Sequence, residues 1–156
     1  MGCANDKAVV TAIPLLPGWT GPTTGKLTLN VHEARFNKDS ESFGTQDPYV
    51  KVKARNQEFC TKTHTDGGVN PKWEECFIID VKFIGDDIEL MFMNKNGMSD
   101  DDNIGICKFK MTTLCANKGV DDWWDMRLKG EEVGKIHLSS NWCPDEIVKA
   151  GSQAAA

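Results

Sequence analysis

The chain of 156 residues has no long apolar run and no excess of basic residues. No window approaches the roughly 18 consecutive apolar residues that a membrane-spanning helix needs. The apolar stretch 8–16 is interrupted by Thr11 and Pro14 and has no basic flank, so it does not resemble a signal peptide. The 18 Lys and Arg against 23 Asp and Glu give a net charge of −5, which argues against nucleic acid as a partner. These absences predict one soluble domain in the cytoplasm.

The six cysteines lack the spacing of a metal site. No two are arranged as Cys-x-x-Cys, so a structural zinc site is not expected. Cys60, Cys76 and Cys107 lie within apolar runs. The pattern favours free, buried thiols in a reducing compartment over a disulfide framework.

Motifs of catalysis are missing too. The three histidines, His32, His64 and His137, are isolated from one another in the sequence. The chain has no Gly-x-Ser-x-Gly elbow and no glycine-rich phosphate loop. We therefore expect a binding module and not an enzyme.

What the sequence does contain is a series of short apolar runs, several of which alternate with polar residues. Leu27, Leu29 and Val31 alternate with polar residues, which is the period of a half-buried strand. Turn sequences separate the runs. The eight runs are 27–31, 50–54, 58–63, 76–81, 88–93, 104–109, 123–128 and 133–138. They predict an all-β, eight-stranded antiparallel sandwich, with one short helical turn at 112–118. The residues expected in or near its core are Trp73, Phe77, Ile79, Leu90 and Phe92.

Composition also predicts where the domain begins and ends. Residues 1–24 are rich in proline and glycine and are expected to form an extended arm. Residues 25–143 form the predicted domain, and residues 144–156 a flexible tail.

Two segments carry motifs of a known family. Residues 44–50 read Gly-Thr-Gln-Asp-Pro-Tyr-Val, and residues 70–77 read Asn-Pro-Lys-Trp-Glu-Glu-Cys-Phe. They resemble the Gly-x-Ser-Asp-Pro-Tyr-Val and Asn-Pro-x-Trp-x-Glu-x-Phe motifs of C2 domains, the calcium-dependent lipid-binding modules. Ile104-Gly105, Trp124 and residues 134–138 follow in the family's order, so the resemblance covers about residues 25–142.

The resemblance implies a C2-type sandwich. The first and last strands are similar in order to those of the permuted, phospholipase-type members. A strand contributed by the N-terminal arm would change that assignment.

The resemblance also implies calcium ligands in three loops at one end of the sandwich. Calcium takes roughly 6–8 oxygen ligands, and charged ligands raise its affinity. Two leading aspartates of the third loop are replaced by Asn94 and Asn96, which predicts weak binding, in or above the roughly 10⁻⁴ M range. A residual acidic loop without physiological calcium fits the same residues, and Asp100 and Asp101 add acidity nearby. The implied ligand positions are Asp39, Glu41, Asp47, Asn94, Asn96, Ser99 and Asp102.

Three further features point to a membrane. Phe43 and Met98 occupy loop tips that enter the bilayer in many members, although both could fold back onto the loops. A basic strand face resembles a phosphoinositide-binding patch, or is a solvated surface. Its residues are Tyr49, Lys51, Lys53, Arg55 and Lys62. The start resembles that of dually acylated proteins, with Gly2 for myristate and Cys3 for palmitate. The alternative is an ordinary flexible start, because Asp6 stands where Ser or Thr is usual.

Together these features predict a peripheral membrane module in the cytoplasm. It would dock on anionic phospholipid or phosphoinositide with weak dependence on calcium as cofactor. The alternative is a calcium-independent structural or adaptor protein that uses the sandwich to dock protein partners in an assembly.

Overall fold

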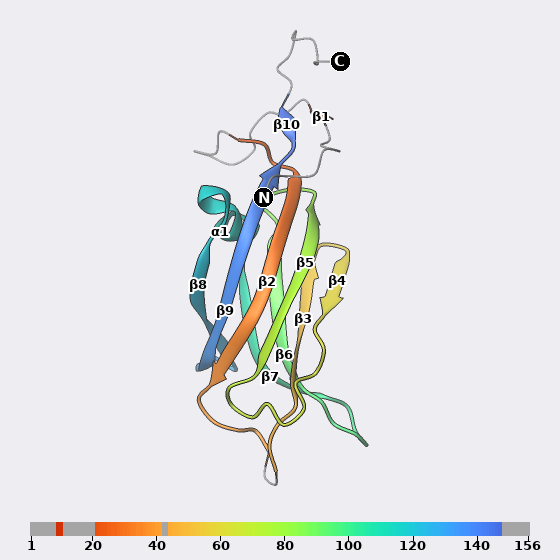
Figure 1. The fold of residues 1–156 in the computed structure, drawn as a ribbon, viewed down its shortest axis with the longest axis vertical. Helices are drawn as coiled ribbons and strands as arrows, with labels where there is room; N and C mark the ends of the chain where they lie inside the picture. The colour runs from red at the N-terminus through yellow and green to blue at the C-terminus, as the bar shows by residue number, and fades with distance from the viewer. Residues whose placement is uncertain (1–8, 11–20, 42–43, 148–156) are drawn as a thin grey trace.

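The computed structural model describes residues 9–10, 21–41 and 44–147 (Figure 1). Its elements, in chain order, are β1 (Val9–Val10), β2 (Gly25–Phe36), β3 (Pro48–Ala54), β4 (Gln57–Cys60), β5 (Lys72–Val81), β6 (Asp87–Asn94), β7 (Asp102–Lys110), α1 (Met111–Cys115), the 3₁₀ turn η1 (Ala116–Lys118), β8 (Asp121–Leu128), β9 (Glu131–Pro144) and β10 (Glu146–Ile147). Strands β2 to β9 correspond to the eight predicted runs, so the all-β, eight-stranded prediction is confirmed. Among the described residues, no helix is long and apolar enough to cross a membrane.

The eight strands form two layers. They are hydrogen-bonded in the order β4-β3-β6-β7-β8-β9-β2-β5, and every pairing is antiparallel. Strands β7 and β8 share a single register pair, Ile106 with Arg127, so the order divides there into two groups of four. Figure 1 shows β9, β2 and β5 in front of β3, β6 and β7, as expected for a sandwich.

The first strand of the sandwich lies beside the last. Strand β2 pairs with β9 on one side and with β5 on the other. The assignment to the permuted, phospholipase-type connection stays a prediction. Strands β1 and β10 pair with each other in parallel, outside the eight-stranded sheet. The predicted domain boundaries also stay a prediction.

A β-bulge in β2 decides which of its residues enter the core. Leu27, Leu29 and Val31 are fully buried, as their alternation predicts. The register to β9 shifts after Val31, where two residues of β2 lie opposite one of β9, so β2 carries one extra residue there; in the pairing with β5 the extra residue lies on β5 instead. The next inward residues are therefore Ala34 and Phe36, both of which are buried. The bulge thus brings an aromatic ring into the core at the loop end of β2.

The predicted core residues are confirmed. Ile79, Leu90 and Phe92 have no exposed surface, and Trp73 and Phe77 are partly buried against the same cluster. Burying one such large apolar side chain completely stabilises the fold by about 1.5–3 kcal/mol. The predicted helical turn is also present, as α1 and η1.

The cysteine prediction is only partly right. Cys107 and Cys115 are free and buried, and burial raises the pKa of each thiol to about 12. Cys60 and Cys76 are free but exposed, because they occupy outward positions on β4 and β5. Cys143 is disulfide-bonded, which contradicts the prediction of free thiols throughout.

Two of the histidines belong to a stacked cluster on the outer face of the β8-β9-β2-β5 layer. The rings of His32 and His137 lie 4.4 Å apart, and His137 also stacks on Trp123 at 5.1 Å. His32 Nδ1 lies 2.6 Å from a carboxylate oxygen of Glu74, and His137 Nε2 lies 2.6 Å from one of Asp121. Both imidazoles are therefore held by neighbouring side chains at the surface.

The loops that carry the predicted ligands lie together at one end of the sandwich. Residues 37–47 connect β2 to β3, residues 61–71 connect β4 to β5, and residues 95–101 connect β6 to β7. Figure 1 shows all three at the lower end, where the turn between β8 and β9 also lies.

Candidate functional site

The β2–β3 and β4–β5 loops are joined by the buried side chain of Gln46, which is 1% exposed. Its amide oxygen accepts hydrogen bonds from the backbone N–H of Ser40 at 3.0 Å and from the Ser40 hydroxyl at 2.8 Å. Its amide nitrogen donates to the carbonyl of Gly68 at 2.7 Å. Gly68 has φ +62°, a conformation that glycine adopts without steric cost. Gln46 therefore fixes the relative positions of two of the three loops.

Two of the predicted calcium-binding carboxylates accept backbone hydrogen bonds. Asp39 accepts from the N–H of Glu41 at 2.8 Å and from the N–H of Gln46 at 3.2 Å. Asp47 accepts from the N–H of Asp66 at 2.7 Å, which ties the β2–β3 loop to the β4–β5 loop. Part of the lone-pair capacity of both carboxylates is thus used inside the protein.

Asn94, at the end of β6, is fully buried and links the strand before the third loop to the first loop. Its amide oxygen accepts from the N–H of Asp47 at 2.8 Å. Its amide nitrogen donates to the carboxylate of Glu41 and lies 3.5 Å from the hydroxyl of Ser40. A neutral N–H donor therefore faces Glu41 where the family pattern has a carboxylate.

The β6–β7 loop is anchored by Asp101. Its carboxylate accepts from the N–H of Asn96 at 2.8 Å and from the hydroxyl of Tyr49, and these two bonds, in that order, lower the pKa of Asp101. Burial, and then the bond to Asp101, raise the pKa of Tyr49 above its usual range. The side-chain amide of Asn96 donates to the carbonyl of Asp100 at 2.7 Å and lies 3.3 Å from the Asp102 carboxylate. The loop is thus closed by its own polar groups.

These contacts decide how well the loops suit calcium. The candidate ligand atoms of these loops are oxygens, which a hard cation such as calcium prefers. Among residues 21–41 and 44–147, however, no three acidic, histidine or cysteine side chains converge as a metal site. In the arrangement described, a cation would have to displace the Asn94 amide from Glu41. The residues therefore do not form a preorganised calcium site.

Two remaining predicted loop residues are exposed. Met98, at the tip of the β6–β7 loop, is fully exposed, and Ser99 beside it is exposed as well. Phe43, Gly2 and Cys3 lie outside the described residues.

The predicted basic face is present, but its charges are not equivalent. Lys51 and Lys53 both occupy outward positions on β3. Lys53 lies opposite Glu58 on one neighbouring strand and Glu89 on the other, whereas Lys51 lies opposite uncharged residues. Arg55, at the far end of the predicted face, forms an ion pair with a carboxylate on the β5–β6 turn, at 2.7 Å. Lys51 thus has no acidic cross-strand neighbour, and the acidic group that interacts with it is the Asp101 carboxylate of the β6–β7 loop.

A cluster of three lysines forms at the loop end of this face. The bond from Thr61 N–H to Val50 O at 2.9 Å continues the β3–β4 ladder, so Lys62 lies beside Tyr49. Lys95 places its ammonium 5.9 Å from the centre of the Tyr49 ring. Tyr49 itself is buried. We call Lys51, Lys62 and Lys95 the loop-end basic cluster.

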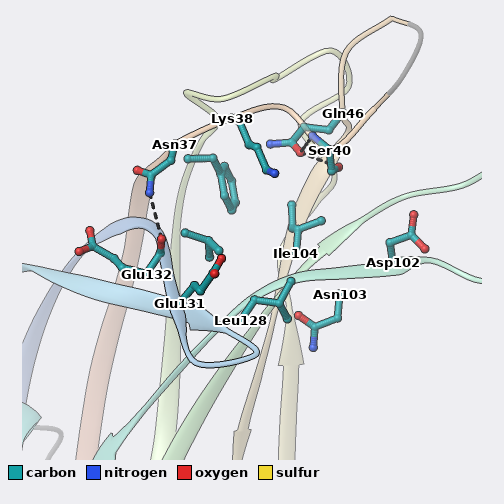
Figure 2. A pocket seen from close by; sticks show the side chains of 12 residues that line it. Asn37, Lys38, Ser40, Gln46, Asp102, Asn103, Ile104, Leu128, Glu131 and Glu132 are labelled. Carbon is teal, nitrogen blue, oxygen red and sulfur yellow. Dashed lines mark hydrogen bonds between the residues drawn. The ribbon is translucent and has the colours of Figure 1, made fainter.

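A cavity of about 550 Å³ lies at the same end, between the start of the β2–β3 loop, the start of β7 and the β8–β9 turn. Figure 2 shows Lys38 and Glu131 reaching toward it from opposite sides. Its lining includes the apolar residues Phe36, Ile104, Leu128 and Val133.

Sequence analysis did not assign a role to Gln46, Lys95 or Glu131. Gln46 directly precedes the Asp-Pro-Tyr motif, but nothing in the sequence marks it as buried. Lys95 lies in the third loop, and only the pairing of β6 with β3 brings it to the basic face. Glu131 is one of two consecutive glutamates at the start of β9.

Comparison with known proteins agrees with the fold and the motifs. The C2 domain model matches residues 25–126. Extended synaptotagmin-1 of Homo sapiens is 31% identical over 96 residues, which make up 61% of this chain and only 8% of that protein. The chain therefore corresponds to a small part of this relative.

Two solved structures share the fold. A C2 domain of plant Extended Synaptotagmin 1 matches with a TM-score of 0.70 at 18% identity, over 80% of this chain and 98% of that one. A calcium-bound pair of C2 domains from Extended-Synaptotagmin 2 matches with a TM-score of 0.68 at 22% identity, over 79% of this chain and 47% of that one. With the family model covering most of the sandwich and these motifs in place, the chain belongs to the C2 domain family.

Proposed function

We propose that this C2 domain is a peripheral membrane module of the cytoplasm, which docks on anionic phospholipid or phosphoinositide through the loop-end basic cluster. The observation that carries the proposal is the grouping of Lys51, Lys62 and Lys95 on one face. None of the three forms an ion pair with another described residue. Each basic residue near an anionic leaflet contributes about 1 kcal/mol, so three supply about 3 kcal/mol. The domain acts by binding and not by catalysis.

The exposed side chain of Met98 supports docking through the same end of the domain. A fully exposed, flexible apolar side chain at a loop tip beside a basic surface suits insertion at the membrane interface. Insertion of Phe43 and acylation of Gly2 belong to the same proposal and would add membrane affinity, as would acylation of Cys3 when its thiol is free.

Calcium has a small part in this docking. The Extended-Synaptotagmin 2 structure is calcium bound, which is a property of that protein. In this chain the Asn94 amide lies against Glu41, and Asp39 and Asp47 accept backbone N–H groups. Calcium binding through Asp39, Glu41, Asp47, Asn94, Asn96, Ser99 and Asp102 would therefore be weak.

Vesicle co-sedimentation tests the proposal. Vesicles that contain phosphatidylserine or a phosphoinositide are compared with neutral vesicles, each with calcium and with chelator. Binding is expected on anionic vesicles in chelator, with a loss at high salt.

Three substitutions that each remove one positive charge make the test specific. Lys51→Ala should weaken binding about fivefold at low salt, the equivalent of about 1 kcal/mol. Lys53→Ala should weaken it less, because Glu58 and Glu89 flank Lys53. Lys118→Ala, at the far end of the domain, is the control. Equal effects of all three substitutions would show that only net charge matters. No binding to any vesicle would favour the adaptor function, with a protein as partner.

A further inference from the structure

The cavity between the β2–β3 loop and the β8–β9 turn combines an apolar lining with two opposite charges. Phe36 and Ile104 are each 7% exposed, and Leu128 and Val133 are half-buried. The walls are tied together, because Asn37 donates from its backbone to the carbonyl of Val133 at 2.9 Å. The side-chain amide of Asn37 also donates to the backbone carbonyl of Glu132 at 3.1 Å (Figure 2). The cavity is therefore held between two connected segments.

The charged groups at the mouth are Lys38 and Glu131. They approach from opposite sides in Figure 2, and neither forms an ion pair with another described residue. Neighbouring Glu132 also lines the cavity, but it differs from Glu131 because its carboxylate lies 3.5 Å from the ammonium of Lys135. The ammonium of Lys38 and the carboxylate of Glu131 thus face the apolar lining from opposite sides without forming an ion pair with each other.

This arrangement is complementary to a zwitterion with an apolar body. A phosphate can pair with Lys38 while a cationic group lies near Glu131. Two further acidic residues, Asp102 and Glu132, also line the cavity, so its surroundings are net negative and disfavour a purely anionic headgroup. The cavity therefore differs in chemistry from the loop-end basic cluster.

The apolar part of the lining favours a quaternary ammonium over a primary one. A primary ammonium has three N–H donors that need acceptors. The neutral acceptors are already used, because the amide oxygen of Gln46 accepts two bonds from Ser40 and that of Asn103 accepts from a backbone N–H at 3.0 Å. A primary ammonium would therefore depend on the carboxylates of the lining alone. A trimethylammonium group needs no acceptors, and its methyl groups can pack against an aromatic ring and aliphatic side chains such as those of the lining.

We propose that this cavity binds the phosphocholine headgroup of a membrane phospholipid. Lys38 pairs with the phosphate, Glu131 with the ammonium, and Phe36 and its apolar neighbours contact the methyl groups. The proposal rests on the proposed membrane function for the source of the ligand, since the cavity opens at the loop end. Anionic lipid at the basic cluster and phosphocholine in the cavity then act as two separate contacts with one membrane.

A soluble headgroup tests the cavity without a membrane. Glycerophosphocholine is titrated into the protein, and the methyl NMR signals of Ile104, Leu128 and Val133 are followed. These signals should shift with saturation, whereas glycerophosphoethanolamine should shift them less at equal concentration. Glu131→Gln should weaken binding about fivefold, the size of one partly screened charge pair. Asp122→Asn, the same change in charge at the other end of β8, should have no effect.

Two controls define the recognition. Lys38→Gln should also weaken the binding of glycerophosphocholine. Choline chloride should bind to the native protein more weakly than glycerophosphocholine does. Equal binding of choline, or no shift of the three methyl signals, would overturn the proposal.

Vesicles then identify the source of the headgroup. Two vesicle types share the same fraction of phosphatidylserine, and the remainder is either phosphatidylcholine or phosphatidylethanolamine. The native protein should prefer the phosphatidylcholine vesicles, and Glu131→Gln should remove that preference. Lys51→Ala should lower binding to both types and leave the preference intact. Solution binding without a vesicle preference would overturn the lipid source. A preference that persists when Lys51→Ala has no effect would instead refute docking through the basic cluster.

Discussion

Asn94→Asp is the substitution that tests the loop geometry most directly. The native amide is fully buried and has two roles, as an acceptor for the N–H of Asp47 and as a donor to the carboxylate of Glu41. A carboxylate at position 94 keeps the first role and cannot perform the second when ionised. It also places a second negative charge beside Glu41.

The expected cost follows from these contacts. Loss of a hydrogen bond to a charged partner costs about 1.5–3 kcal/mol, and breaking a buried charged interaction costs about 3–5 kcal/mol. Because Glu41 is only half-buried, we expect a loss near the lower end, about 3 kcal/mol. In a chain of this size that loss lowers the unfolding temperature by roughly 6–12 °C.

Thermal unfolding followed by circular dichroism measures this effect in chelator and in calcium. In chelator, Asn94→Asp should unfold well below the native protein. Calcium should restore much of the loss, because the cation replaces the missing donor between two carboxylates. Asn56→Asp, the same change in an exposed turn at the opposite end of β3, is the matched control and should unfold like the native protein.

Either of two results would refute the reasoning. An unchanged unfolding temperature in chelator would mean that the Asn94–Glu41 contact contributes nothing to stability. A destabilised variant that calcium does not rescue would mean that Asp39, Glu41 and Asp47 do not converge on a cation even with a carboxylate at position 94.

Three other predictions concern the same end of the domain. Gln46→Ala removes three side-chain hydrogen bonds, and should lower the free energy of unfolding by about 2–4 kcal/mol with an unchanged denaturant slope in urea titration. Tyr49 is the single tyrosine, so absorbance near the phenolate band reports its ionisation alone. Because folding raises the pKa of Tyr49, its contribution to the free energy of unfolding is fully present below the ordinary tyrosine pKa of about 10 and is lost as the pH rises above that value. Asp101→Asn should lower that pKa only in part, since burial is the larger cause. Met98→Ala should weaken vesicle binding while the unfolding temperature stays unchanged, because the side chain is fully exposed; a parallel fall in both would contradict a membrane role.

The number and type of the strands could be predicted from the sequence because local alternation reports which side of a strand is buried. Ile79, Leu90 and Phe92 were recognisable as core for the same reason. The motifs around Asp47 and Trp73 were enough to indicate the C2 family, which the family model confirms. Exposure of Cys60 and Cys76 was missed, because a residue in an apolar run can still occupy the outward phase of an edge strand.

The sequence by itself therefore determined an antiparallel C2 sandwich with a depleted set of loop carboxylates. Only the tertiary structure decided what the remaining carboxylates contact, because that depends on loops brought together from three parts of the chain. It also decided that Lys53 is flanked by glutamates while Lys51 is not, since cross-strand register is not encoded in the period of one strand. The bulge after Val31 turned Phe36 inward, and long-range pairing set Lys38 opposite Glu131 across the cavity. Local periodicity fixes the phase of each strand, whereas the contacts between strands and loops fix the site.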